Sequence, residues 1–237
     1  MDGVPTDKSN LVIRSLDLFR EKTGSQQFYK VYLNKSIPAQ AGLGGGSGNA
    51  ATALFAANEL CGRPATADDL VLWSADLGSD ITFFLSSGTC YCTGRGEILH
   101  PQEALPEEKV WLVKPNGGLS TPTVFKNLDY ELLSNEDPLE LLQNLASFGL
   151  DGAKLINDLE PPAFKAMPSL SEMKMALQAQ GFKHVLMSGS GSTIFCLGNP
   201  SQPNLGWAQS FADKWGVTVH ETKFINRCEP ANWYVEY

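Results

Sequence analysis

The sequence lacks the features that mark membrane proteins and nucleic-acid-binding proteins. No apolar run reaches the roughly 18 residues that a membrane-spanning helix requires. Lysine and arginine form no basic block, and 18 of them stand against 26 aspartates and glutamates, which gives a net charge of -8. A surface of this sign repels the phosphates of DNA and RNA. We therefore expect neither a membrane nor a nucleic acid as partner.

Metal-binding and hydrolase patterns are missing as well. The five cysteines include no Cys-x-x-Cys pair, and none of the three histidines has metal-ligand spacing or lies in a nucleophile elbow. We therefore assign no metal site to the side chains. Because the number of cysteines is odd, we expect free thiols in a reducing compartment.

The residues that are present are typical of a folded protein of mixed structure. The chain has 237 residues, 43% of them hydrophobic, which suits one large domain or two small ones. Helical periodicity marks residues 10–22, and a capping-box pattern followed by Gly78 predicts a helix over 66–77. Alternating or apolar runs predict strands at 28–33, 81–85 and 89–92.

The second half of the chain predicts an α+β domain. Its order is a strand, two helices, two strands, a helix and a strand, which is a split β-α-β arrangement if the two middle helices form one layer. A polar, proline-bearing stretch at 100–109 precedes it and predicts a domain boundary. The predicted elements are 110–114, 139–148, 169–180, 185–187, 193–197, 207–215 and 217–224.

A glycine-rich loop, Gly42–Gly48, directly precedes a predicted helix over 49–60. Each glycine costs conformational entropy, so the loop indicates close approach of the backbone to a neighbour. Free N–H groups and the helix dipole favour a phosphate there, and the Ser47 hydroxyl would add a ligand for phosphate or Mg2+. The pattern is neither a P-loop, since no Lys-Ser or Lys-Thr follows, nor the dinucleotide fingerprint, since Asn49 replaces its third glycine. A flexible linker is the alternative, which the adjoining helix disfavours.

Two further places are open to more than one interpretation. The loop Ser188–Ser192 separates two short apolar strands, and it suits either close packing against another backbone or a plain hairpin. Asp80 stands between the helix stop at Gly78 and an apolar segment that we predict to be a strand. Its carboxylate is either a general base that takes a proton from a hydroxyl or an ordinary loop aspartate.

Taken together, the motifs closely resemble those of the GHMP small-molecule kinases, over nearly the whole chain from Gly3. The resemblance implies an α+β fold of two domains. Residues 1–105 would form the ATP-binding N-terminal domain, which is like domain 2 of ribosomal protein S5, and residues 106–237 a ferredoxin-like split β-α-β C-terminal domain. The motifs are Lys35-x-Ile37-Pro38 with the glycine loop and Asn49-Ala50-Ala51, Leu77-Gly78-Ser79-Asp80, Ser188–Ser192, Thr93–Glu97, 157–162 and 233–236.

The GHMP resemblance also implies roles for individual residues. Asp80 matches the catalytic aspartate of the family, and Ser120 and Thr121 match a stretch on the substrate side. The third GHMP motif consists of Ser188, Gly189, Ser190, Gly191 and Ser192. The residues that would bind ATP are Pro38, Ala39, Gln40, Ala41, Gly42, Leu43, Gly44, Gly45, Gly46, Ser47, Gly48 and Asn49.

Within the family, the Gly-Leu-Gly-Gly-Gly-Ser loop resembles one branch. Its members use ATP and Mg2+ to phosphorylate the 2-hydroxyl of 4-diphosphocytidyl-2-C-methyl-D-erythritol, a step of the non-mevalonate pathway to isoprenoids and terpenoids. The motifs at Thr93–Glu97, 157–162 and 233–236 are similar to the plant and algal versions. The resemblance thus implies the plastid in a eukaryote and the cytoplasm otherwise.

The sequence departs from the family pattern in two ways. The family begins with a further segment that carries a lysine in a Lys-x-Asn strand and an Asp-Gly-Tyr-His turn, and the resemblance here starts after it. Lys35 precedes the glycine loop, so we do not give it the role of that lysine. Gly48 replaces a usual serine. Two alternatives therefore stay open: a short form that binds nucleotide with impaired catalysis, and a GHMP kinase with another small alcohol acceptor.

Overall fold

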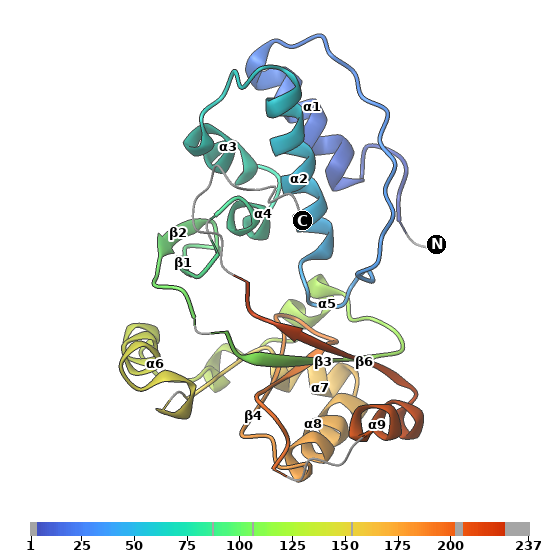
Figure 1. Ribbon diagram of the computed structural model, residues 1–237, viewed down its shortest axis with the longest axis vertical. Helices are drawn as coiled ribbons and strands as arrows, with labels where there is room; N and C mark the ends of the chain where they lie inside the picture. Colours follow the sequence, from blue (N-terminus) through green and yellow to red (C-terminus); the bar gives the residue numbers. More distant parts are fainter. Residues whose placement is uncertain (1–3, 87, 106, 153, 202–205, 226–237) are drawn as a thin grey trace. The chain divides into compact units, whose positions relative to one another are not determined.

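The computed structural model describes residues 4–86, 88–105, 107–152, 154–201 and 206–225, so the motif at 233–236 lies outside the described residues. Two compact units make up the chain (Figure 1). Of the described residues, the N-terminal unit contains those up to Ala39, Gly44–Leu105 and Ile225. The C-terminal unit contains Gln40–Leu43 and residues 107–224. The glycine loop is therefore shared, because its chain passes from one unit to the other after Leu43.

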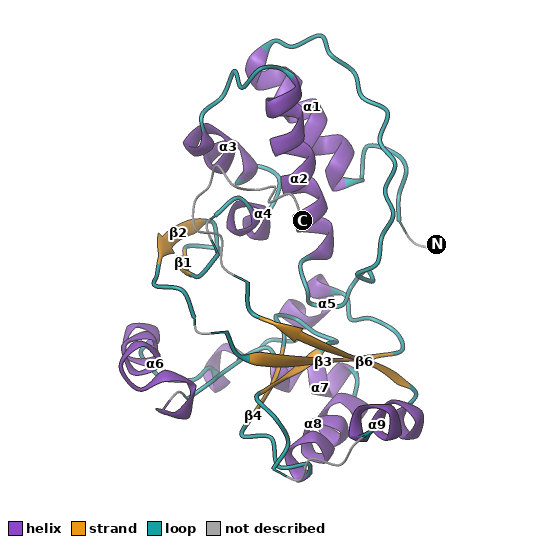
Figure 2. Ribbon diagram, in the orientation of Figure 1, coloured by secondary structure: helices purple, strands orange, loops and turns teal. Residues whose placement is uncertain are grey.

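The described part of the N-terminal unit consists of helices and one two-stranded antiparallel sheet (Figure 2). The first helix begins at the N-cap Asn10 and ends at Gly24 in the left-handed conformation, as the periodicity predicts. The predicted capping box is present, since Thr66 and Asp69 exchange backbone and side-chain hydrogen bonds. The elements are α1 (Leu11–Thr23), α2 (Gly45–Leu60), α3 (Ala67–Ser74), α4 (Ser79–Phe84), β1 (Cys90–Thr93) and β2 (Ile98–Pro101).

The prediction of a strand over 81–85 is wrong, because this segment forms most of helix α4. Its apolar run fits either structure when only length and composition are considered. In the fold, Ile81 and Leu85 are both buried while Phe83 is partly exposed, which is the spacing of a helix face. Asp80 consequently lies in the first turn of a helix and does not lead into a strand.

The prediction of a strand over 28–33 is also wrong, because this segment is extended but pairs with no strand in the described residues. Its side chains do not alternate between core and solvent either: Tyr29 is half-buried, with its hydroxyl 3.0 Å from Cys61 Sγ, but Phe28, Val31 and Tyr32 are 71%, 51% and 82% exposed. A strand also needs the backbone groups of a neighbour, and alternation of side chains does not supply them.

The strand order of the C-terminal unit confirms the predicted split β-α-β arrangement, but the two predicted middle helices do not form one layer. Of the described residues of the helix at 138–152, none belongs to the core, and a helix at 160–166 joins the one at 169–179 there instead. The unit's four strands form one antiparallel sheet in the order β4-β5-β3-β6, so that β3 lies between strands that follow it in the chain. The loop Ser188–Ser192 connects the hairpin of β4 and β5, in which Met187 pairs with Ile194. The elements are β3 (Lys109–Pro115), α5 (Thr121–Lys126), α6 (Pro138–Gly152), α7 (Glu160–Ala166), α8 (Ser169–Ala179), β4 (His184–Met187), β5 (Ile194–Leu197), α9 (Trp207–Trp215) and β6 (Val217–Lys223), with a short 3-10 helix at Tyr130–Leu132.

Helices α7, α8 and α9 cover one face of this sheet and close its core (Figure 1). Leu170 and Leu177 of α8 are fully buried there against Ile194 of β5. At the edge of the core, the Glu160 carboxylate accepts hydrogen bonds from Lys174 Nζ at 2.6 Å and from the Met187 N–H at 2.9 Å. This buried carboxylate therefore ties α7 to α8 and to the strand that leads into the Ser188–Ser192 loop.

We predict that Glu160→Ala lowers the free energy of unfolding by about 2–3 kcal/mol, because it leaves a buried N–H and an ammonium group without their acceptor. Glu221→Ala is the matched control: it removes an exposed ion pair, 2.7 Å from Lys109 Nζ, and we expect a cost of at most about 1 kcal/mol. Urea unfolding followed by tryptophan fluorescence measures both. Equal costs would contradict the role given to Glu160.

Candidate active site

Helix α2 begins without a side-chain cap, as a helix that binds an anion does. Its N-cap is Gly44, in the left-handed conformation (φ 61°). Glycine has no side chain that could accept hydrogen bonds from the free N–H groups of the first turn. A Cβ on Gly44 would lie 2.6 Å from the ring of Phe84 on α4, so glycine is required there. Ser47, which we predicted at or beside the N-cap, is the third residue of the helix. The dipole of this 16-residue helix adds positive potential to the same end.

Among the described residues, Lys35 places a cation at this end of α2. Its Nζ lies 3.1 Å from a Cβ built on Gly45, and Cγ2 of Ile37 lies 2.8 Å from the same Cβ. The lysine is half-buried, and burial lowers the pKa of its ammonium group from 10.5. An oxyanion at the helix end would offset that cost, because it would pair with a cation that is already partly desolvated.

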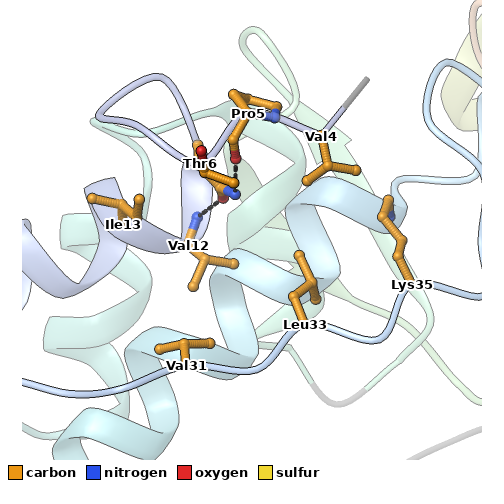
Figure 3. A pocket seen from close by; sticks show the side chains of 9 residues that line it. Val4, Pro5, Thr6, Val12, Ile13, Val31, Leu33 and Lys35 are labelled. Carbon is orange, nitrogen blue, oxygen red and sulfur yellow. Dashed lines mark hydrogen bonds between the residues drawn. The ribbon is translucent and has the colours of Figure 1, made fainter. Parts of the chain in front are cut away.

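Two adjoining cavities, of about 360 and 230 Å3, open beside Lys35 (Figure 3). Their walls are largely apolar, and the larger one is drawn in Figure 3 between the start of α1 and the extended segment that carries Val31, Leu33 and Lys35. The side chain of Asn10 lines both cavities and is held by hydrogen bonds to Pro5 O and the Val12 N–H. Apolar walls with few polar groups are typical of pockets for flat organic ligands. The smaller cavity also reaches α2, where it is lined by Gly46 and Asn49.

Asp80 belongs to the same unit as this end of α2. It lies in the first turn of α4, and its side chain is exposed. Helix α4 packs on the start of α2 through Phe84, whose ring meets Gly44 and would lie 3.4 Å from a Cβ on Gly48. A Cβ at position 48 would therefore be in van der Waals contact with the Phe84 ring. The Asp80 carboxylate is exposed to solvent.

In the C-terminal unit, the first part of the glycine loop packs on the third motif, backbone against backbone. A Cβ on Gly42 would overlap the carbonyl oxygen of Ser188, and the Ser188 hydroxyl donates to Gly42 O at 2.8 Å. The Thr193 N–H donates to Ala41 O at 3.1 Å. Of the two interpretations of Ser188–Ser192, the structure supports close packing against another backbone.

The structure also brings Thr121 to this cluster. Its hydroxyl lies 2.8 Å from the hydroxyl of Ser190, and Ser120 is the N-cap of the same helix, α5. The segment before them is fixed from two sides, since the Ser192 hydroxyl donates to Gly117 O at 3.1 Å and the Leu119 N–H donates to Gln40 O at 3.3 Å. The predicted site residues therefore form two clusters, one in each unit, with the glycine loop contributing to both.

Sequence reasoning missed several residues that hold these clusters. Asn157 donates through Nδ2 to Met187 O and Gly189 O, both at 2.8 Å, and so fixes the third motif. Lys114 is 8% exposed and donates to Pro115 O and Gly117 O, and burial lowers its pKa. No local pattern marks Lys114, whereas Asn157 begins the family motif at 157–162, to which we gave no role in the site. Lys35 is part of the motif Lys35-x-Ile37-Pro38, but the sequence analysis gives it no role in the site.

The family models of the GHMP kinases match both units. The model described as "GHMP kinases N terminal domain" matches residues 10–88, and "GHMP kinases C terminal" matches residues 130–209. The chain is similar to a chloroplastic 4-diphosphocytidyl-2-C-methyl-D-erythritol kinase of Arabidopsis thaliana, with 45% identity over 100% of this chain and 62% of that protein. This chain therefore spans less than two thirds of the length of that relative. A relative in Protochlamydia amoebophila, named as the same kinase, is 47% identical over 84% of this chain and 67% of its own length.

The fold agrees with that likeness. A crystal structure of 4-(cytidine 5'-diphospho)-2C-methyl-D-erythritol kinase superposes with a TM-score of 0.74 and 33% identity, over 92% of this chain and 79% of that one. The expected two-domain GHMP fold is therefore confirmed. From the family models and these relatives together, the chain belongs to the GHMP kinase family, and it is similar to members that are named 4-diphosphocytidyl-2-C-methyl-D-erythritol kinases.

Proposed function

We propose that this protein transfers the γ-phosphoryl group of ATP to the 2-hydroxyl of 4-diphosphocytidyl-2-C-methyl-D-erythritol, in the non-mevalonate pathway to isoprenoids. The observation that carries the proposal is the half-buried ammonium of Lys35 beside the uncapped N-terminus of α2. The names of the relatives support this acceptor. The plant relatives named as chloroplastic support the plastid as its compartment in a plant or alga.

ATP would bind with its phosphates at the start of α2. The N–H groups of Gly45, Gly46 and Ser47 lack intrahelical acceptors, so they are available to phosphate oxygens. Lys35 adds a full positive charge at the same place, which partly replaces the lysine of a P-loop. The nucleoside would occupy the apolar cavities between α1 and the segment of Val31 and Leu33.

Mg2+ would enter as part of the ATP complex. The described residues contain no group of three or more His, Cys, Asp or Glu side chains that could hold a metal by themselves. This fits Mg2+, which is commonly bound by one or two protein oxygens together with substrate phosphates. The Ser47 hydroxyl and the Asp80 carboxylate are the oxygen donors that would hold it. When bound, the ion would neutralise negative charge on the phosphates.

Asp80 would act on the acceptor alcohol. Its carboxylate accepts the proton of the 2-hydroxyl while that oxygen forms a bond to the γ-phosphorus and the bond to ADP breaks. An exposed position in the first turn of α4 suits this task, because the carboxylate can contact a substrate that binds from solvent. The products are ADP and the 2-phosphate ester of the acceptor.

The cluster in the C-terminal unit would contact a substrate through hydroxyl groups. Thr121 and Ser190 present two hydroxyl groups 2.8 Å apart, and Ser120 precedes Thr121 as the N-cap of α5. The loop Ser188–Ser192 would also hold the glycine loop in shape through its contact with Gly42. Hydroxyl pairs of this kind bind sugar alcohols through exchangeable hydrogen bonds.

We predict that Asp80→Asn lowers kcat by about 100-fold to 10,000-fold, since an amide cannot accept the proton. Asp68→Asn is the matched control, because Asp68 is also an exposed aspartate in the first turn of a helix of the same unit, and it should keep full activity. The measurement is ATP-dependent phosphorylation of 4-diphosphocytidyl-2-C-methyl-D-erythritol, followed by 31P NMR.

The assay also separates the alternatives. Turnover of homoserine or mevalonate in place of this acceptor would identify a GHMP kinase with another substrate. Binding of ATP without turnover would identify a nucleotide-binding form. Unchanged activity in Asp80→Asn would overturn the role of this carboxylate.

We predict that Lys35→Gln raises the KM for ATP about 10-fold or more and changes kcat less, because the cation binds phosphates in ground state and transition state alike. Lys30→Gln is the control: Lys30 lies on the same extended segment, 5.2 Å above the Tyr32 ring and outside the cavities of Lys35. Equal KM values for the two variants would remove Lys35 from the site.

A further inference from the structure

The turn between β1 and β2, Thr93–Glu97, has a closely specified backbone conformation for which the proposed site gives no reason. It contains two glycines with positive φ, Gly94 at 70° and Gly96 at 107°, on either side of Arg95. The turn closes through a hydrogen bond from the Gly96 N–H to Thr93 O at 3.1 Å. Both glycine positions disfavour other residues, so the backbone path around Arg95 is specified closely.

Glu97 folds back over the turn and fixes it. Its carboxylate accepts from the Arg95 N–H at 2.6 Å and lies 3.4 Å from Arg95 Nε. A Cβ on Gly94 would lie 3.1 Å from a carboxylate oxygen of Glu97, so the glycine makes room for it. The hydrogen bonds from its own N–H and from Arg95 lower the pKa of Glu97, which keeps it ionised. The strong contact is with the backbone of Arg95, and the guanidinium is held only loosely.

The turn packs against the start of α4, next to Asp80. A Cβ on Gly96 would lie 3.7 Å from Cβ of Ser79, the residue before Asp80. A second observation agrees: the pKa of the Cys92 thiol on β1 is raised by burial, by Cys90 and by the negative charge of Asp80. The hairpin that carries Arg95 is thus within electrostatic reach of the Asp80 carboxylate, inside one compact unit.

The chemistry proposed for Asp80 calls for positive charge at that place beyond that of one Mg2+ ion. Asp80 is negative, and the substrates bring a triphosphate and a diphosphate, so the charges repel one another. The Arg95 side chain is 73% exposed, which leaves the guanidinium accessible to phosphate oxygens, and arginine binds them in a bidentate fashion.

We propose that Arg95 binds a phosphate group of the substrates beside Asp80, with Glu97 holding the turn that presents it. The inference rests on the proposed function. It makes Arg95 a binding and charge-stabilising residue for phosphoryl transfer, and Glu97 a positioning residue.

The test compares Arg95→Gln with Arg63→Gln in the full chain. Arg63 is 72% exposed and also pairs with a glutamate, Glu59, at 2.8 Å, so the two changes remove a similar arginine from a similar pair. We expect Arg95→Gln to lower kcat/KM at least about 10-fold, Arg95→Lys to restore part of the loss, and Arg63→Gln to have no effect. A rise in the KM for ATP alone would assign the phosphate to ATP, and a rise for the acceptor alone would assign it to the diphosphate.

Thermal melting and calorimetry keep the outcomes apart. All variants should melt within a few degrees of the unaltered chain, and a loss of activity that follows loss of folding would make Arg95 structural and overturn the inference. If the unaltered chain binds both substrates without turnover, calorimetry compares the affinities of Arg95→Gln and Arg63→Gln for each substrate. A weaker affinity in Arg95→Gln for either substrate supports the inference. Equal activity or affinity in these two variants overturns the inference alone. If the unaltered chain binds neither substrate, the proposed function fails and the inference falls with it.

Discussion

The contact that the candidate site depends on is the one between the Gly42 backbone and the loop Ser188–Ser192. No side chain fits there, because a Cβ on Gly42 would overlap the Ser188 carbonyl. The contact fixes the first part of the glycine loop within the C-terminal unit, and the chain then enters α2 of the N-terminal unit at Gly45. Glycine is therefore needed twice, once for backbone packing at Gly42 and once for the left-handed N-cap at Gly44.

Charge at the N-terminal site follows from how α2 begins. A serine or aspartate N-cap would satisfy the first N–H groups of the helix and occupy the place of a ligand. Gly44 leaves these groups free, and Lys35 supplies a cation whose partial burial costs free energy unless an anion is present. Asp80 supplies the opposite charge on the neighbouring helix α4. Both features make sense if phosphates bind at the start of α2 and a proton is removed at the start of α4.

Local signals predicted most of the fold, and they failed where the outcome depends on distant partners. Hydrophobic periodicity predicted α1, and the capping-box pattern predicted α3, in which the capping box is present. The apolar run of α4 has no periodicity that separates a helix from a strand. Residues 28–33 have an alternating sequence that is typical of a strand, but they pair with no strand in the described residues. In the site, glycine and serine motifs marked both clusters. The sequence does not reveal the hydrogen bonds that Asn157 and Lys114 donate to backbone carbonyl groups, although Asn157 stands in a family motif.

The most direct test of the central claim is a crystal structure of the chain with a non-hydrolysable ATP analogue and the acceptor. We predict that the triphosphate lies against the N–H groups at the start of α2 within reach of Lys35, and that the 2-hydroxyl of the acceptor lies within about 3 Å of the Asp80 carboxylate. A nucleotide bound elsewhere on the protein, or an acceptor hydroxyl remote from Asp80, would contradict the claim.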